Sequence, residues 1–326
     1  MRPVGDLIGE LAPALERWGL ESVLSIERAT SGTMNDTYLL QTGAGRAVLR
    51  RHRHRDHGRA EREHALIAHV RDRGIPVPAA LPTQTGVLVA EVGGRLYSMF
   101  EYAAGRQVGR SALRVGHAHS LGATLAGIHD ALTGAEPVKA DAPHADPPRC
   151  ADTIARLAEL LALATSRPDP QPSDAWAARR MRDRIEWLSA QPDRALADGP
   201  AGQVIHGDYQ DSNVFFDDAG QVCAVIDWDK AEIGHAGAEV VRALALMFAL
   251  EPAASRAFVA GYRARRALPA AQLDDGAHRY GTGTLHDTWV YDSVYRNGDD
   301  RARRFIRPGP YVPFERQWQQ VRDLLV

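Results

Sequence analysis

The spacing of hydrophobic residues changes several times along the first hundred positions, and each spacing predicts a different element. Apolar residues at helical intervals predict an amphipathic helix near the N-terminus: Leu7, Leu11, Leu15 and Trp18. Stretches rich in β-branched and aromatic residues, with glycine-containing turns, predict strands: VLSIERA, TYLLQTGAGRAVLRR and GVLVAEVGGRLYSMFEY. Between the last two, a helical face is formed by Ala60, His64, Ile67 and Val70, and it ends at Gly74 and Pro76. This region therefore predicts antiparallel strands with one helix inserted among them.

After Gly105 the hydrophobic pattern is mainly helical. Further helices are predicted over HSLGATLAGIHDAL, ADTIARLAELLALA, SDAWAARRMRDRIEWLSAQ and the short apolar run LALMFAL. Two short hydrophobic runs, one on each side of DDAG, are the exceptions. We expect an α+β fold with a small antiparallel-sheet lobe over residues 1–104 and a larger, mostly helical lobe over residues 105–326. The lobes should meet near Met99 to Gly105.

Composition excludes several classes of protein. With 44% hydrophobic and 25% charged residues among 326, the chain is typical of a globular protein that is large enough for two lobes. A net charge of -2 gives no reason to expect nucleic acid or an anionic membrane surface as partner. No apolar run approaches the roughly 20 residues of a membrane span, and acids interrupt the N-terminal apolar stretch, so we expect neither a membrane segment nor a signal peptide. Two cysteines, Cys150 and Cys223, form no disulfide framework and favour a reducing, cytoplasmic setting.

The two short hydrophobic runs enclose a dense group of polar residues. The stretch VIHGDYQDSNVFF, residues 204–216, places Asp208 and Asn213 five positions apart, and Asp227 follows the second run in VIDWD. Because DDAG between the runs predicts a turn, they should form a hairpin that brings Asp227 beside Asp208 and Asn213. Two carboxylates and one amide oxygen would then converge, and such hard oxygen ligands are those that Mg²⁺ prefers.

This pattern resembles a device of protein kinases, in which H-R-D-x-x-x-x-N is followed by an acidic D-F-G. The version here, His206-Gly207-Asp208 with Asn213 and then Asp227-Trp228, resembles the aminoglycoside phosphotransferase family. That family shares the protein-kinase-like bilobal fold and includes choline, homoserine and other small-molecule kinases. The resemblance implies that Asp208 accepts the proton of an acceptor hydroxyl. It also implies that Asn213 and Asp227 hold Mg²⁺ against the phosphates of ATP.

The same resemblance assigns nucleotide contacts to the N-terminal lobe. The loop within Ala29–Leu40 should cover the phosphates with backbone N–H groups, at Ser31, Gly32 and Thr33. Arg50 stands where kinases carry a phosphate-binding lysine, and Glu63 on the inserted helix is its expected partner. An exposed-edge strand around Phe100 to Tyr102 should offer backbone groups to adenine.

Contacts to the acceptor and to the catalytic loop are also implied. Asp211 and Asp229 flank the catalytic groups, and the aromatic and acidic stretch 284–300 contains Asp287, Trp289 and Asp292. These five residues are the candidates for binding an acceptor. His206 and Glu239 are expected to brace the catalytic loop by hydrogen bonds, although the family usually has Asp where Glu239 stands.

The sequence thus predicts an ATP-dependent phosphotransferase that acts on a hydroxyl of a sugar, an amino sugar, an amino alcohol or a related natural product. Two alternatives stay open. One is a metal-dependent hydrolase that uses His206, Asp208, Asp227, Asp229 and His235 as ligands, although no histidine pair has the usual metal-ligand spacing. The other is a catalytically silent kinase-like module that binds a metabolite, which the arginine at position 50 would suit. The acceptor, the choice between ATP and GTP and the oligomeric state do not follow from the sequence.

Overall fold

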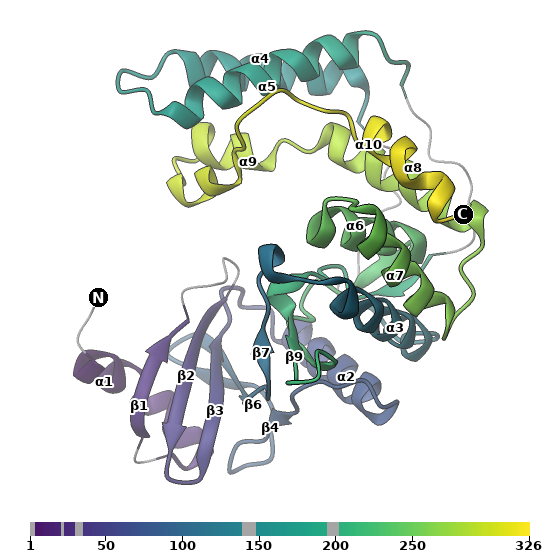
Figure 1. Ribbon diagram of the computed structural model, residues 1–326. Coiled ribbons are helices and arrows are strands. Elements are labelled where there is room, and N and C mark those ends of the chain that lie inside the picture. The colour runs from purple at the N-terminus through teal and green to yellow at the C-terminus, as the bar shows by residue number, and fades with distance from the viewer. Residues whose placement is uncertain (1–3, 21–22, 30–34, 139–147, 194–201) are drawn as a thin grey trace. The chain divides into compact units, whose positions relative to one another are not determined.

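A computed structural model describes residues 4–20, 23–29, 35–138, 148–193 and 202–326, which fall into two compact units (Figure 1). The first unit combines residues 1–142 with residues 202–268, and the second combines residues 143–201 with residues 269–326. The expected lobe boundary after residue 104 falls inside the first unit, and it stays a prediction about that unit's internal organisation.

The first unit begins with a helix and a strand-rich segment. Its elements up to residue 107 are α1 (Val4–Leu15), β1 (Val23–Arg28), β2 (Asp36–Thr42), β3 (Gly45–Arg51), α2 (His57–Asp72), β4 (Ala80–Leu81), β5 (Ala90–Val92), β6 (Arg95–Glu101) and β7 (Arg106–Gln107). Strands β1, β2, β3, β6 and β4 form an antiparallel sheet in this order, and β5 also pairs with β6. The predicted antiparallel strands with one inserted helix, α2, are therefore confirmed.

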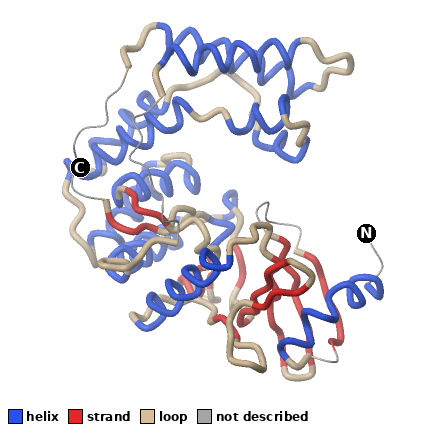
Figure 2. The backbone as a smooth tube through the Cα atoms, turned by 180° about the vertical axis from the view of Figure 1, so that it is seen from behind, coloured by secondary structure: helices blue, strands red, loops and turns tan. Residues whose placement is uncertain are grey.

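The two faces of this sheet carry different side chains because residues alternate along each strand. On β6, Tyr97 and Met99 join a hydrophobic core with Leu11 of α1, and this N-terminal helix lies across the strands (Figure 2). Ser98 points to the opposite face, where its hydroxyl contacts His64 of α2 at 2.7 Å. The inserted helix therefore packs on the more polar face of the sheet.

The rest of the first unit is helical, with two small sheets. Its elements are α3 (Val115–Ala131), β8 (Gln203–Ile205), β9 (Val214–Phe216), β10 (Val222–Val225), β11 (Glu232–Gly234), α6 (Ala236–Phe248) and α7 (Pro252–Arg263). β9 pairs with β7 on one side and with β10 on the other, and β8 pairs with β11. Short 3-10 helices cover Glu16–Trp18, Arg110–Ala112 and Asp211–Asn213.

Helices α3 and α7 pack backbone against backbone. A Cβ atom at Gly122 would lie 1.9 Å from the carbonyl oxygen of Phe258, and one at Gly261 would lie 2.1 Å from that of His119. No side chain larger than hydrogen fits at either position, so the two glycines permit the close approach. The contact therefore holds α3 and α7 close together in this unit.

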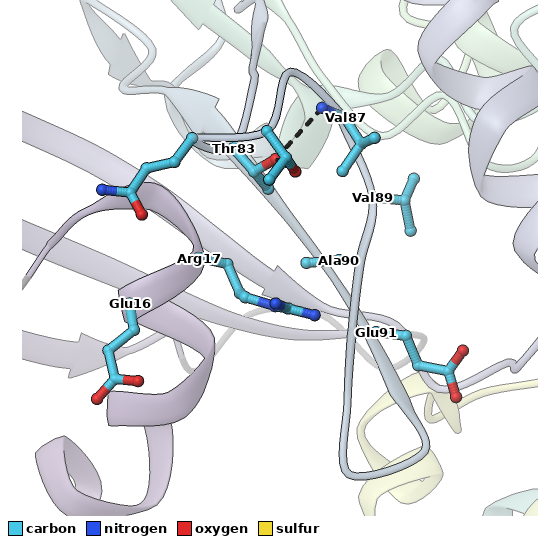
Figure 3. Close-up of a pocket in the computed structure, with 9 residues that line it drawn as sticks. Glu16, Arg17, Thr83, Val87, Val89, Ala90 and Glu91 are labelled. Carbon is cyan, nitrogen blue, oxygen red and sulfur yellow. Dashed lines mark hydrogen bonds between the residues drawn. The ribbon is translucent and has the colours of Figure 1, made fainter.

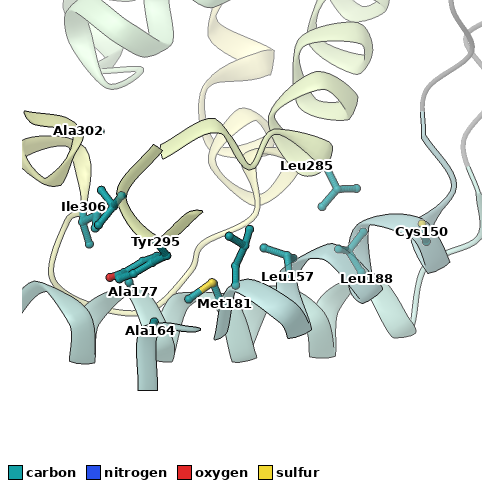
Figure 4. Close-up of a cluster of buried hydrophobic side chains, with 12 residues drawn as sticks. Cys150, Leu157, Ala164, Ala177, Met181, Leu188, Leu285, Tyr295, Ala302 and Ile306 are labelled. Atoms are coloured by element: carbon teal, nitrogen blue, oxygen red, sulfur yellow. The ribbon is translucent and has the colours of Figure 1, made fainter. Parts of the chain in front are cut away.

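The second unit is helical in its described part. Its elements are α4 (Cys150–Thr165), α5 (Pro172–Ser189), α8 (Ala270–His286), α9 (Trp289–Tyr291), a π-helix at Asp292–Arg296, 3-10 helices at Asp300–Phe305 and Arg322–Leu324, and α10 (Phe314–Val321). Side chains of α4 and α5, such as Leu157 and Met181, face Leu285, Tyr295 and Ile306 of the C-terminal segment (Figure 4). The buried cluster gives this unit a hydrophobic core of its own.

The segregation of antiparallel sheet and helices confirms the predicted α+β class. Among the residues that the structure describes, no helix has both the length and the apolar composition needed to cross a bilayer.

Candidate active site

The loop after β8 carries the predicted catalytic sequence His206-Gly207-Asp208. Gly207 has a φ of 77°, a left-handed conformation that favours glycine. A Cβ at this position would also lie 2.3 Å from the carbonyl oxygen of Lys230. Glycine therefore lets the loop turn sharply against the segment that follows Asp227, and the turn places Asp208 at its tip.

The Asp208 carboxylate is almost buried, with 5% of the side chain exposed, and it accepts four hydrogen bonds. Arg242 and Gln210 donate to Oδ1 at 2.6 and 3.1 Å, and Lys230 and Asn213 donate to Oδ2 at 2.9 and 3.3 Å. Burial alone would raise the pKa of Asp208, but the charges and hydrogen bonds of Arg242 and Lys230 outweigh it and lower the pKa below 3.8. The carboxylate is therefore ionised at neutral pH.

Asn213 connects the catalytic loop to the hairpin that follows. Its Nδ2 donates to the main-chain oxygen of Asp208 at 2.9 Å, and its own main-chain oxygen accepts from Ile226 N–H at 2.9 Å. The predicted hairpin is present, because β9 and β10 pair around a turn in which the Asp217 carboxylate accepts two backbone N–H groups. The hairpin returns the chain to Asn213 one residue before Asp227.

Asp227 has a φ of 71°, a left-handed conformation that is uncommon for a residue other than glycine. Strain of this kind concentrates at functional sites. Burial raises the pKa of Asp227, and the negative charges of Asp229 and Asp208 add to the effect, while Arg50 opposes it. Asp227 thus lies near two other carboxylates, and 28% of its own side chain is exposed.

Arg50 lies on β3 and faces both α2 and the Asp227 loop. Its Nη1 donates to Glu63 Oε1 at 2.5 Å, and its Nη2 lies 3.8 Å from Asp227 Oδ1. Burial raises the pKa of Glu63, whose Oε2 has no hydrogen-bond partner. Burial alone would lower the pKa of Arg50, but the charges of Glu63 and Asp227 outweigh it and raise the pKa. The guanidinium therefore stays charged between the carboxylates of Glu63 and Asp227.

This set of groups fits a magnesium ion that is shared with a nucleotide. No group of three His, Cys, Asp or Glu side chains in the described part of the chain forms a ready metal site. Mg²⁺ commonly takes one or two carboxylates and completes its shell with substrate phosphates and water. Asp227 and the amide oxygen of Asn213 are the oxygen donors expected in such a site.

Glu239 on α6 supports the catalytic loop from behind. Its carboxylate accepts the N–H groups of His206 and Gly207 at 3.2 and 2.6 Å, and it also bonds His129 Nε2 at 2.8 Å. Burial alone would raise the pKa of Glu239, but its hydrogen bond and attraction to His129 outweigh it and lower the pKa. The brace expected from the sequence is thus present in the structure. His129 was overlooked as a member of it.

His206 is held in a single tautomer. Its Nδ1 accepts from the Asp208 N–H at 3.2 Å, so Nε2 carries the proton and donates to the Ile226 oxygen at 3.2 Å. Burial lowers its pKa. A neutral ring with both nitrogens engaged positions the loop and is not free to act as a base.

The predicted adenine-binding segment differs from expectation. β6 is not an edge strand, because Phe100 pairs with Val48 of β3 on one side and with Ala80 of β4 on the other. The two-residue strand β4 gave no signal in the sequence. Phe100 is buried, with its ring 5.0 Å from the Arg50 guanidinium, and the Tyr102 ring lies against Arg46 at 3.6 Å. The prediction of backbone groups for adenine is therefore wrong for Phe100, and it stays a prediction for Tyr102, beyond the end of β6 at Glu101.

Two candidate acceptor residues lie near the catalytic loop. Asp211 accepts from the backbone N–H of Arg110 at 3.1 Å and from its guanidinium at 3.4 Å. Asp229 is 2% exposed and contacts Arg59 and Asn35. The Asp211 side chain is 16% exposed. The role of both carboxylates in acceptor binding stays a prediction. Ser31, Gly32 and Thr33, the predicted phosphate loop, lie outside the described residues.

The other three acceptor candidates belong to the second unit. Asp292 pairs with Arg156 at 2.7 Å and accepts from the Thr288 hydroxyl at 2.7 Å. Trp289 is half exposed and packs edge-on against Phe305, and Asp287 accepts from the Trp289 N–H. These contacts are internal to the unit, and a role of the three residues in acceptor binding stays a prediction.

The sequence also failed to identify Lys230 and Arg242 as partners of Asp208. The one available signal was position, because Lys230 directly follows Asp229.

A surface pocket of about 510 Å³ lies elsewhere in the first unit, between the turn at Glu16 and Arg17 and the segment from Thr83 to Glu91 (Figure 3). None of the catalytic candidates lines it.

Proteins of known sequence and structure resemble this chain over most of its length. Residues 25–273 match the family model described as APH, the phosphotransferase enzyme family. A homoserine kinase from Caulobacter sp. (strain K31) is 28% identical over 326 aligned residues, which cover 94% of this chain and 92% of that protein.

Solved structures confirm the protein-kinase-like fold that the sequence predicted. Spectinomycin phosphotransferase in complex with ADP and spectinomycin matches with a TM-score of 0.65 and 13% identity, over 99% of this chain and 98% of the other. Amicoumacin kinase in complex with AMP-PNP, Ca²⁺ and Ami matches with a TM-score of 0.56 and 17% identity, over 95% and 96% of the two chains.

Proposed function

Because the chain belongs to the APH phosphotransferase enzyme family, we propose that it transfers the γ-phosphoryl group of ATP to a hydroxyl group of a small molecule. The observation that carries the proposal is the ionised, buried carboxylate of Asp208, which Asn213 links to the loop that carries Asp227. The family match favours this function over the metal-dependent hydrolase that the acidic cluster alone left open.

In the proposed reaction, the acceptor oxygen attacks the γ-phosphorus, the bond to the bridging oxygen of ADP breaks, and Asp208 takes the hydroxyl proton. The four donors on Asp208 occupy all four lone-pair positions of its two oxygens. One donor must therefore leave before an acceptor hydroxyl can bind. Lys230 is the best candidate, because its side chain is 33% exposed and its long stem can swing toward the transferred phosphoryl group.

Other residues of the site hold the nucleotide. Arg50, oriented by Glu63, would bind phosphate oxygens with two parallel hydrogen bonds, and its contact with Asp227 would give way to them. Asn213 and Asp227 would hold Mg²⁺. The ion would supply positive charge that offsets the charge on the phosphates.

For the acceptor we propose an amino alcohol of the homoserine type. The relative that aligns over nearly its whole length is named homoserine kinase, whereas the aminoglycoside-type structures share the fold at low sequence identity. Sugars, amino sugars and related natural products are the competing acceptor classes.

The test is an acceptor panel scored by ADP release with Mg²⁺ and ATP, including L-homoserine, choline, hexosamines, aminoglycosides and nucleosides. Asp208→Asn keeps the size of the side chain and removes its basicity, so kcat should fall by about 10²- to 10⁴-fold while ATP still binds. Full turnover in that variant would remove Asp208 from the base role. Acceptor binding without ADP release in the wild type would identify a silent module, and turnover without nucleotide would identify a hydrolase.

A further inference from the structure

Asp229 is a deeply buried carboxylate next to the proposed metal site. It stands two residues after Asp227, and its side chain is 2% exposed. Its Oδ2 lies 3.7 Å from Arg59 Nη2 and accepts a hydrogen bond from Asn35 Nδ2 at 3.3 Å. Arg59 Nη2 also donates to the main-chain oxygen of Asp229 at 3.1 Å. We refer to Asp229, Arg59 and Asn35 as the Asp229 latch.

The latch joins segments that are distant in the sequence. Arg59 lies in the first turn of α2, and Asn35 directly precedes β2. Asn35 also accepts from the Arg53 N–H, just beyond β3, at 3.3 Å. One buried carboxylate thus ties the inserted helix and two neighbouring strands to the loop that carries Asp227.

Helix geometry connects the latch to the phosphate-binding side of the site. Arg59 and Glu63 are four residues apart on α2, so they lie on the same helical face. Glu63 holds Arg50, and Arg50 reaches to 3.8 Å from Asp227. The contacts therefore close a ring that runs from Arg59 through Asp229, Asp227, Arg50 and Glu63 back to the helix.

We propose that Arg59 and Asp229 are positioning residues that fix the separation between Arg50 and Asp227. This inference rests on the proposed function, in which those two groups engage the nucleotide phosphates and the magnesium ion. In this role neither Arg59 nor Asp229 contacts a reacting atom. Their role is to hold α2 and the Asp227 loop at a distance that a nucleotide with its metal ion can bridge.

Charge gives the latch a distinctive signature. Arg59 lies against a carboxylate that has one oxygen, Oδ1, without a partner, and the negative charge of Asp229 adds to that around Asp227. Removing Arg59 alone leaves a buried carboxylate without its cation, and the cost of an unpaired buried charge favours a shift of the Asp227 loop toward water. Removing the charge of Asp229 as well relieves that defect. The double variant should therefore bind metal-bound nucleotide better than the Arg59 variant alone.

The experiment measures the affinity of a fluorescent ADP analogue with and without Mg²⁺. Arg59→Gln should weaken binding with Mg²⁺ by about tenfold and change binding without Mg²⁺ by no more than about twofold. The reason is that only the magnesium complex of the nucleotide engages both Arg50 and Asp227. The double variant Arg59→Gln/Asp229→Asn should recover to within about threefold of the wild type. Arg59→Lys, which keeps the charge, should lie between the wild type and Arg59→Gln.

The matched control is Arg62→Gln on the same helix. Arg62 Nε donates to the Val138 oxygen at 2.9 Å, so it also tethers α2 but does not touch the Asp227 loop. Equal losses in Arg59→Gln and Arg62→Gln, or equal losses with and without Mg²⁺, would overturn the inference. If the wild type binds nucleotide but phosphorylates no acceptor, only the proposed function fails. If Mg²⁺ has no effect on wild-type binding, both fail.

Discussion

Replacing Glu239 by glutamine tests whether the brace behind the catalytic loop requires a carboxylate. The side chain is buried and meets three donors: the N–H groups of His206 and Gly207, and Nε2 of His129. Glutamine has the same shape but only one acceptor oxygen. In one orientation its NH₂ group faces the Gly207 N–H. In the other it faces the His206 N–H, and a change of tautomer at His129 does not remove that conflict.

The cost follows from the donor that is left facing another donor. A buried N–H without an acceptor costs about 1–3 kcal/mol, and the remaining bonds lose the strength that a charged acceptor gives them, roughly 1 kcal/mol. Glu239→Gln should therefore lower the free energy of unfolding by about 2–4 kcal/mol. Because the displaced groups directly precede Asp208, kcat/KM should also fall by about tenfold or more.

Urea unfolding at pH 7, followed by circular dichroism, measures the change in stability. Glu251→Gln is a suitable control, because Glu251 also accepts two backbone N–H groups, those of Ala253 and Ala254, but at the exposed start of α7. Water can replace its bonds, so the loss should stay below about 1 kcal/mol. Equal losses in the two variants would refute the argument that donor conflict at Glu239 is what destabilises the loop.

Two further predictions concern the charge on Asp208 and the packing of α3. The pKa of Asp208 is depressed in the folded protein, so its ionised form adds stability that is present above the unfolded-state pKa and is lost as the pH falls through the folded-state value. Lys230→Met removes a positive charge from Asp208 and should raise the apparent pKa of the acid limb of the kcat/KM profile by about one unit. Gln210→Met removes a neutral donor and should raise this pKa less. Equal shifts in the two variants would contradict the charge argument. Gly122→Ala places a Cβ 1.9 Å from a carbonyl oxygen of α7 and should lower the free energy of unfolding in urea by about 2 kcal/mol or more. Gly116→Ala has open space around its Cβ and should not lower it. Similar values for the two variants would show that the helices can separate freely.

The parts of the site that follow from local pattern were predictable from the sequence. Strand-like residues on both sides of DDAG predicted the hairpin, and the hairpin brings Asp227 back toward Asn213. The ion pair between Arg50 and Glu63 could be expected from a family resemblance together with the need of a buried arginine for a counter-charge.

The parts that depend on packing were not predictable. Arg242 is one of many arginines, and it reaches Asp208 only because the packing of α6 turns its side chain toward the loop. In an extended chain Asp229 would face the same way as Asp227, but the φ of 71° at Asp227 interrupts such a conformation. Asp229 therefore turns toward Arg59, a direction that no local pattern contains.

The discontinuity of the first unit has a consequence for synthesis of the chain. Strand β7 receives its partner only when β9 has been made, since Arg106 pairs with Phe216, and helix α3 waits for α7, which ends at Arg263. A nascent chain that stops at residue 201 therefore leaves the edge of β7 and the glycine-lined side of α3 uncovered. The last residue of the site, Arg242, is made only when about three-quarters of the polypeptide has been synthesised, so chaperones have a long interval in which to bind those exposed surfaces.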